Sequence, residues 1–147
     1  MALSSAMALR RLCELKNWSI TNLQANKLLY FAHMIALGES NGTRPLVSEN
    51  FQAWDYGPVL PSAYREAKPF GDKPIKPYLF SHRQPITTEF DDVFQKTLAE
   101  LGSLPSSRLV AESHWSEGAW AEYYRAGGRG IEIPNSAILA EYRKRLH

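Results

Sequence analysis

Apolar residues recur at helical spacing over most of the chain, and one segment stands out. Thr21 and Gln24 fit a capping box, in which each side chain satisfies a backbone N–H at the start of a helix. From there to Gly38, apolar side chains surround nearly the whole circumference of the expected helix. A helix of this kind is normally buried on all sides. The pattern therefore predicts a central, buried helix that ends near Gly38.

Weaker apolar stripes predict further helices, separated by shorter segments of strand character. Thr87 or Thr88 and, later, Asn135 are the expected caps of two of these helices. Together the elements indicate a mainly α (α+β) fold, with about six helices and a small antiparallel β ribbon or sheet, in one domain over residues 1–147. The remaining helices are expected at Ser4–Lys16, Val59–Lys68, Thr87–Leu101, Ser106–Ser113, Glu117–Arg125 and Asn135–Leu146, and the strands at Leu46–Trp54 (one edge strand), Ile75–Phe80 and Ile131–Ile133.

Aromatic residues gather around one predicted turn. Glycine reaches backbone angles closed to other residues and proline restricts its predecessor, so Gly57 and Pro58 should break the chain sharply after Tyr56. Large rings beside a rigid turn are typical of protein-binding hot spots, although the same rings could instead close the core. The candidate partner-binding residues are Trp54, Asp55, Tyr56, Gly57, Pro58, Arg65, His114, Trp115 and Trp120.

Different roles are expected within this group. Trp54 should pack beneath the turn as support, whereas Tyr56 and Trp115 should face a partner. Asp55 and Arg65 should set the orientation of that partner through their charges. The hypothesis separates a residue that supports folding from residues that support binding.

Composition excludes several classes of protein. With 44% apolar and 22% charged residues, the chain is not expected to be disordered. The single cysteine, Cys13, cannot form an internal disulfide or a multi-cysteine zinc site, and it fits a buried position in the first helix. The apolar-then-basic order at the N-terminus is the reverse of a signal peptide, and no apolar run could span a membrane. A cytoplasmic protein without membrane partners is expected.

The charge pattern argues against specific nucleic-acid binding. The net charge is only +2, and it divides into +4 over residues 1–83, −5 over 86–122 and +3 over 123–147. A nucleic-acid-binding domain should be strongly basic, with its basic residues on one face. The uneven distribution is better suited to orienting a charged protein partner.

The sequence indicates no complete catalytic set and no cofactor-binding loop. The sequence lacks a Walker loop and HExxH, and its four histidines, His33, His82, His114 and His147, do not have metal-site spacing. Neither a metal nor a cofactor is expected. His33 fits a hydrogen-bonded histidine in the core, and the glycine-rich segment 127–130 fits a plain turn. A small hydrolase or transferase that uses His114 or His33 nevertheless remains an open alternative.

Two motifs resemble those of the SocA-like antitoxins, the Panacea domain family, which includes phage-associated GepA proteins. Residues 23–32 are similar to the family's L-Q-x-x-K-L-L-Y-F-A helix, and residues 53–59 to its A-W-x-x-G-P-V motif. Later, Ser113-His114 with Trp120 resembles an S-H-x-W portion, although Ala119 stands where the family often has proline. The resemblance extends over nearly the whole chain.

The resemblance implies a non-catalytic cytoplasmic antitoxin that neutralises a cognate protein toxin by direct binding. For some members of the family it also implies an adaptor role, in which the toxin is delivered to ClpX of the ClpXP protease. Two alternatives stay open at this point. One is the small enzyme that uses His114 or His33, and the other is a DNA-binding autoregulator.

Overall fold

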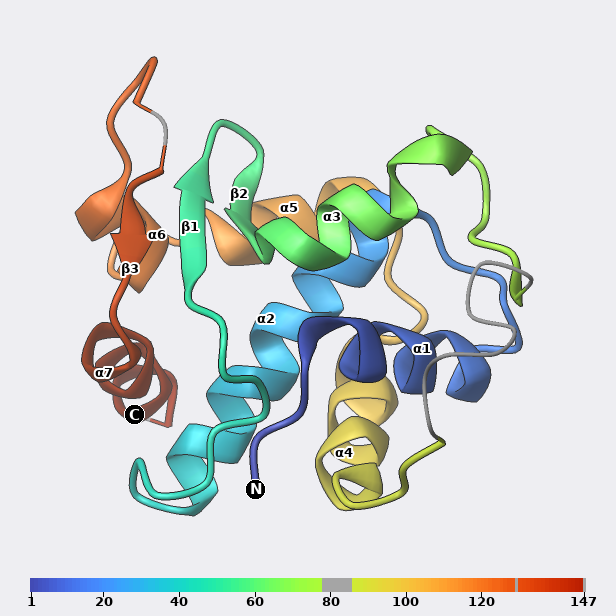
Figure 1. Ribbon diagram of the computed structural model, residues 1–147. Helices are drawn as coiled ribbons and strands as arrows, with labels where there is room; N and C mark the ends of the chain where they lie inside the picture. The colour runs from blue at the N-terminus through green and yellow to red at the C-terminus, as the bar shows by residue number, and fades with distance from the viewer. Residues whose placement is uncertain (78–85, 129, 147) are drawn as a thin grey trace.

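The computed structural model describes residues 1–77, 86–128 and 130–146, and within them the chain is mainly helical (Figure 1). These residues form α1 (Ser5–Leu15), α2 (Asn22–Glu39), α3 (Pro61–Ala67), the 3-10 turn η1 (Lys68–Phe70), α4 (Asp91–Leu101), α5 (Ser106–Ser113), α6 (Ala119–Tyr123) and α7 (Asn135–Arg145). The strands are β1 (Phe51–Trp54), β2 (Gly57–Val59) and β3 (Glu132–Ile133). The predicted class, mainly helical with a small antiparallel sheet, is confirmed.

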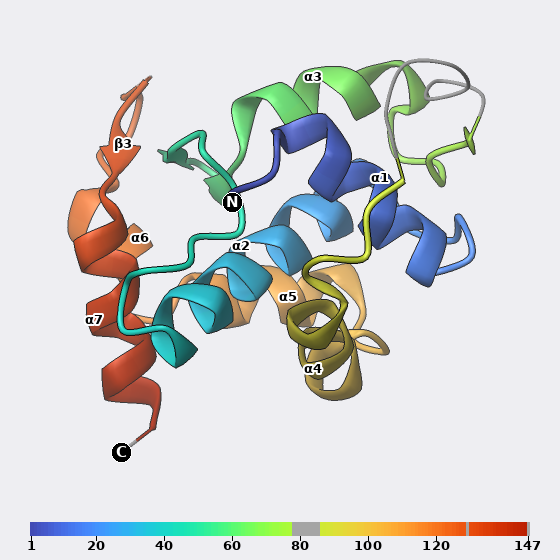
Figure 2. The same ribbon diagram turned by 60° about the horizontal axis from the view of Figure 1, so that its bottom comes forward.

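Helix α2 is the centre of the fold, as its all-round apolar pattern predicted. The Thr21 side chain accepts from the Gln24 backbone, and Gln24 returns a bond to the Thr21 backbone, so the predicted capping box is present. Helices α1, α3, α4, α5 and α7 all pack against α2. Figure 2 shows α1 and α3 on one side of α2 and α5 on the other. The first turns of α2 are thereby held between several elements.

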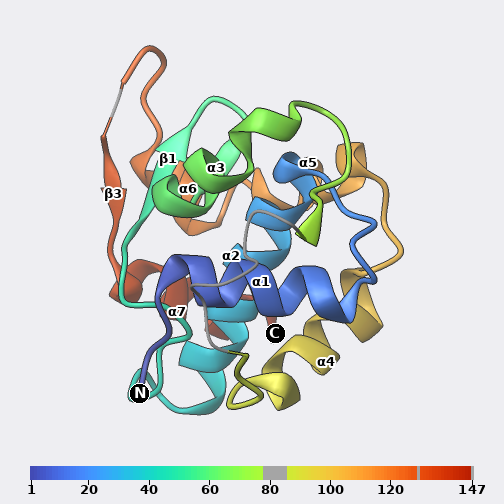
Figure 3. The same ribbon diagram turned by 45° about the vertical axis from the view of Figure 1, so that its right-hand side comes forward.

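The sheet corrects the prediction of one edge strand over Leu46–Trp54. Only Phe51–Trp54 is a strand, and it lies in the middle of the order β2-β1-β3, with antiparallel partners on both sides. The segment after Tyr56 was expected to lead straight into a helix, but Gly57–Val59 first forms β2 and α3 begins at Pro61. Pro58 has no N–H to donate, and an edge strand tolerates that loss. Figures 1 and 3 show the sheet at the end of the molecule away from α4.

Two predicted helix caps are wrong, and the structure gives the reason for one of them. Asn135 is the first residue of α7 rather than its cap, because its Oδ1 lies 2.9 Å from Nε2 of the buried His33. Helix α4 starts at Asp91, with Phe90 as the N-cap residue and no side-chain cap bond. The Thr87 hydroxyl instead accepts from the backbone N–H of Glu89. The hydrogen bond to His33 thus engages the Asn135 side chain, which the local sequence predicted as a helix cap.

The remaining elements differ in length from the predictions. The helix expected over Glu117–Arg125 spans only Ala119–Tyr123, since Tyr124 already has an extended backbone. Residues 75–77 of the strand expected at Ile75–Phe80 are not a strand, and the rest of it lies outside the described residues. None of the helices in the described part of the chain combines the length and apolarity that a membrane crossing requires.

Candidate functional site

A two-residue turn at the tip of the β1–β2 hairpin presents Tyr56 to solvent. Trp54 pairs with Gly57 across the hairpin, which leaves Asp55 and Tyr56 as the turn. Gly57 has φ +112°, a conformation that L side chains rarely adopt, so glycine is required there as the sequence predicted. The Tyr56 side chain is 71% exposed, although it is large and partly apolar. A fixed backbone therefore holds an exposed aromatic ring.

A stack of three rings attaches this hairpin to the α5–α6 segment. His114 and Trp120 stack with centroids 3.8 Å apart, and Trp120 stacks on Tyr124 at 4.5 Å. The Trp120 indole donates to the backbone carbonyl of Trp54 at 2.7 Å, and the Tyr124 hydroxyl donates to the Asp55 carboxylate at 2.5 Å. The hairpin is thus anchored through its backbone and through one carboxylate, while Tyr56 is left outside these contacts.

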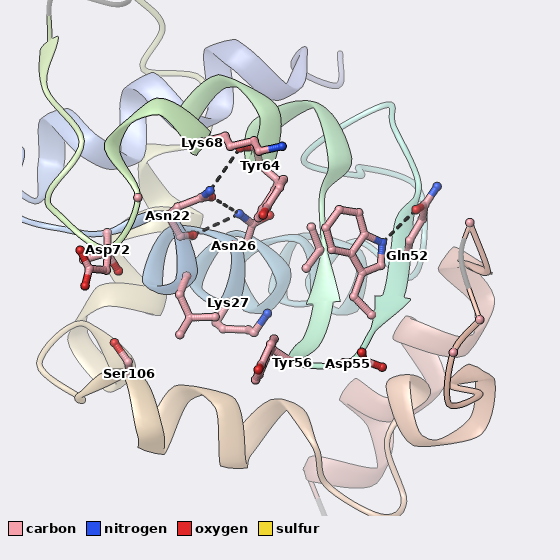
Figure 4. A pocket seen from close by; sticks show the side chains of 18 residues that line it. Asn22, Asn26, Lys27, Gln52, Asp55, Tyr56, Tyr64, Lys68, Asp72 and Ser106 are labelled. Carbon is pink, nitrogen blue, oxygen red and sulfur yellow. Dashed lines mark hydrogen bonds between the residues drawn. The ribbon is translucent and has the colours of Figure 1, made fainter.

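A groove of about 890 Å³ lies beside the hairpin (Figure 4). Its walls come from the first turns of α2, the hairpin, α3 with the segment after it, the start of α5 and the glycine-rich segment. Leu23, 37% exposed, and Tyr56 both line it and are among the exposed large apolar side chains of the described residues. Its size lies in the range of ligand-binding clefts. Other lining residues include Asn22, Asn26, Lys27, Trp54, Asp55, Val59 and Tyr64.

Side-chain hydrogen bonds fix one wall of the groove. Asn26 Oδ1 accepts from the backbone of Leu60 at 2.9 Å, and its amide donates to Asn22 Oδ1 at 2.8 Å. The Asn22 amide in turn donates to the Tyr64 carbonyl at 3.2 Å. This chain of bonds ties α2 to α3 and to the connection between β2 and α3. The wall is therefore formed without a ligand, which lowers the entropy lost on binding.

The structure brings most of the predicted site residues together and leaves two apart. The Trp115 ring packs under the Arg145 guanidinium, 4.7 Å away, rather than beside the hairpin. Arg65 is exposed on α3 and donates to Ser62 of its own helix. The Trp54 ring packs against Tyr64 of α3, so it supports the hairpin directly beside its turn. The residues gathered at or next to the hairpin are Trp54, Asp55, Tyr56, Gly57, Pro58, His114 and Trp120.

Lys27 is the main site residue that the sequence reasoning missed. Its side chain is completely buried in the groove wall, where Nζ donates to the Pro58 carbonyl at 3.0 Å. No carboxylate in the described part of the chain forms an ion pair with it, and burial lowers the pKa of Lys27 to about 7. The signal was a lysine on a helix that is otherwise apolar on all sides, since lysine is almost never fully buried without a partner.

Neither described histidine fits the enzymatic alternative well. His33 is buried, bonded to Asn135 and has a pKa lowered to about 4 by burial, which confirms the prediction of a core histidine. His114 Nε2 is enclosed without a hydrogen-bond partner. Burial and the charge of Lys27 lower the pKa of His114, while the backbone of Tyr56 opposes the shift. A general base is usually oriented by a further group, often a carboxylate. Among the described residues, neither imidazole is bonded to a carboxylate. His82 and His147 lie outside these residues.

Other candidate chemistry is accounted for by packing. Cys13 is buried in α1, and burial raises the pKa of its thiol to about 12, which confirms the prediction of a core residue. No group of three or more potential metal ligands occurs within residues 1–77, 86–128 and 130–146. Gly127, Gly128 and Gly130 line one edge of the groove, whereas Arg129 lies outside the described residues.

Lys27 should make stability depend on pH between about pH 7 and pH 9. In this interval the unfolded chain binds the Lys27 proton more tightly than the folded chain does, so the free energy of unfolding should rise with pH, by about 2 kcal/mol. In the folded chain His33 and His114 titrate below this interval and Cys13 above it. The Cys13 thiol of the unfolded chain loses its proton near pH 9, which opposes the rise slightly and equally in wild type and Lys27→Met. Urea unfolding of wild type and Lys27→Met at both pH values tests this, because the rise should vanish in the variant. An equal rise in both proteins would assign it to other groups.

Comparison with known proteins identifies relatives of this chain. A family model described as "Antitoxin SocA-like, Panacea domain" matches residues 26–121. Antitoxin SocA from Caulobacter vibrioides (strain NA1000 / CB15N) is 37% identical over 138 residues, covering 84% of this chain and 72% of that protein. No solved structure matches the chain. The resemblance inferred from the two motifs is confirmed, and the matched range includes Lys27, the hairpin and Trp120.

Proposed function

Because the chain belongs to the SocA-like antitoxin family with the Panacea domain, we propose that it neutralises a cognate protein toxin by direct binding at the hairpin and groove. The single observation that carries this proposal is Tyr56, an exposed ring on a fixed turn beside a preformed groove. Rigid aromatic side chains provide wide contact area at low conformational entropy. Large exposed apolar side chains at a concave surface mark sites of interaction.

A co-expression assay tests the proposal. A short reading frame next to this gene should be lethal when expressed alone and tolerated together with this chain. Purified toxin and antitoxin should then form a complex that is measurable by calorimetric titration. If no neighbouring product is toxic, or a toxic one is tolerated without forming a complex, neutralisation by direct binding is wrong.

Delivery of the bound toxin to the ClpXP protease is a further form of the same proposal, and it places the protein in the cytoplasm. The family resemblance is its support. An adaptor should accelerate toxin degradation by purified ClpXP and ATP, whereas a blocking antitoxin should neutralise the toxin equally well in cells without ClpX. An adaptor leads to degradation of the toxin, whereas a blocking antitoxin leaves the toxin intact in the complex.

Stability and binding should separate at the hairpin. Tyr56→Ala should leave unfolding nearly unchanged and weaken toxin binding by about 1 to 2 kcal/mol, because the ring is exposed in the free protein. Trp54→Ala should instead lower the free energy of unfolding by about 1 to 2 kcal/mol, since its half-buried ring packs on Tyr64. Circular dichroism melts and calorimetric titration of the toxin measure both effects.

The matched control is Leu146→Ala. Leu146 is 64% exposed but lies just beyond α7 and does not line the groove, so its loss should change neither quantity. If Tyr56→Ala unfolds the protein, or binds the toxin as tightly as wild type, the hairpin is structural and the toxin binds elsewhere.

A further inference from the structure

Lys27 is a buried lysine that has no anionic partner among the described residues. Its side chain has no exposed surface, and its one hydrogen-bond acceptor within the described residues is the neutral Pro58 carbonyl. The ammonium group has three donors, so two of them remain for another acceptor. A buried charge is normally paired, because its loss of hydration is otherwise not compensated.

The position of Lys27 places these donors beside the proposed binding surface. Lys27 lines the groove, and its Nζ lies 3.3 Å from the point where a side chain on Gly57 would begin. Gly57 directly follows Tyr56, and Figure 4 shows the lysine nitrogen directed toward this end of the hairpin. In the part of the chain that the structure describes, Tyr56 is largely exposed and no hydrogen bond holds its hydroxyl. The Tyr56 ring is thus free to change its position when a partner binds.

A second enclosed nitrogen lies near the same hairpin. His114 Nε2 has no hydrogen-bond partner among the described residues. Burial first, and then the charge of Lys27, lower the pKa of His114, so the two groups repel each other when both are protonated. Asp55, the carboxylate of the turn, is bonded to the Tyr124 hydroxyl instead. The neighbourhood of the hairpin therefore has two enclosed nitrogens and no carboxylate committed to either.

The edge of β2 does not suit the addition of a strand. Pro58 has no N–H, its carbonyl is occupied by Lys27, and the N–H of Leu60 is occupied by Asn26. A partner that added a strand would need these backbone groups. Recognition in the groove must therefore depend on side chains.

We infer that the groove receives a segment of the bound toxin that inserts an aspartate or glutamate side chain toward Lys27, with apolar residues of the segment on Leu23 and Tyr56. This inference rests on the proposed function. Its basis is charge complementarity, because the segment supplies the anion that the described part of this chain lacks. The carboxylate would accept the two free Lys27 donors and stabilise the charged lysine, so binding near pH 8 should take up a proton.

Lys27→Met tests the inference in the full-length chain with the cognate toxin. Methionine has a similar length without the charge, and neutral replacement of a buried charge is often tolerated. The variant should fold, bind toxin at least about tenfold more weakly, and lose the proton uptake that calorimetry detects in buffers of different ionisation enthalpy. Lys73→Met, an exposed lysine outside the groove lining, is the matched control and should bind like wild type.

The toxin supplies the second arm of the test. Among Asp→Asn and Glu→Gln variants of the toxin, one should weaken binding to wild type and have no additional effect on Lys27→Met, as a double-mutant cycle reveals. If the toxin binds wild type and Lys27→Met equally tightly, with equal proton uptake, the inference is wrong while the proposed function stands. If the toxin does not bind wild type, the proposed function itself is wrong.

Discussion

Glu141→Ala is expected to lower the free energy of unfolding by about 3 to 5 kcal/mol. The Glu141 side chain on α7 is buried, and its carboxylate accepts from the Tyr30 hydroxyl at 2.6 Å, the Ala119 N–H at 2.9 Å and the Arg145 guanidinium at 2.7 Å. These three donors come from α2, α6 and α7. Alanine would leave the Tyr30 hydroxyl and the Ala119 N–H without an acceptor in a buried site, and Arg145 would keep only its bonds to Glu112. Each buried group left unsatisfied is costly.

Glu112→Ala is the matched control for this change. Glu112 also pairs with Arg145, at 3.5 Å, but its side chain is 39% exposed, so its loss should cost less than about 1 kcal/mol. Urea unfolding followed by circular dichroism compares the two variants. Equal losses would show that the Glu141 carboxylate is not the joint between α2, α6 and α7.

The sequence predicted the parts of the fold that local signals determine. Helix α2 carries both its signals within its own residues, the Thr21–Gln24 box and the all-round apolar pattern, and both are present. The central place of β1 depends instead on pairing with β3, as between Phe51 and Ile133. No local pattern contains that pairing. The Asn135 side chain likewise bonds to His33, a residue remote in the sequence, instead of capping α7.

The candidate site was predictable to the same extent. Gly57 and Pro58 indicated a turn, and the turn exposes Tyr56 as predicted. Whether Trp115 joins the hairpin depends on the packing of α7, where Arg145 covers its ring. The groove is also absent from any local pattern, because its walls come from segments that are far apart in the sequence. The sequence pattern indicated that Lys27 lies on the buried helix, but only the structure shows that no anionic side chain among the described residues pairs with it.

Gly57→Ala is expected to lower the free energy of unfolding by about 2 to 6 kcal/mol and to weaken toxin binding with it. Gly57 has φ +112°, and holding alanine there adds backbone strain of about 1 to 3 kcal/mol. The new methyl group would also lie 2.6 Å from Ser113 Oγ and 3.0 Å from Lys27 Cε, an overpacking of about the same size. Both effects act at the joint between the hairpin, α2 and α5.

The double variant Gly57→Ala/Ser113→Ala separates the two causes. Removal of the Ser113 hydroxyl takes away the closest atom, so it should recover about 1 to 2 kcal/mol of the loss, whereas the strain from φ should remain. Ser113→Ala alone, which gives up only a bond to the Val110 carbonyl, serves as the reference. Urea unfolding of the four proteins completes the cycle. A Gly57→Ala variant as stable as wild type would mean that the hairpin moves freely against α2, and Lys27 could then not hold a fixed place beneath it.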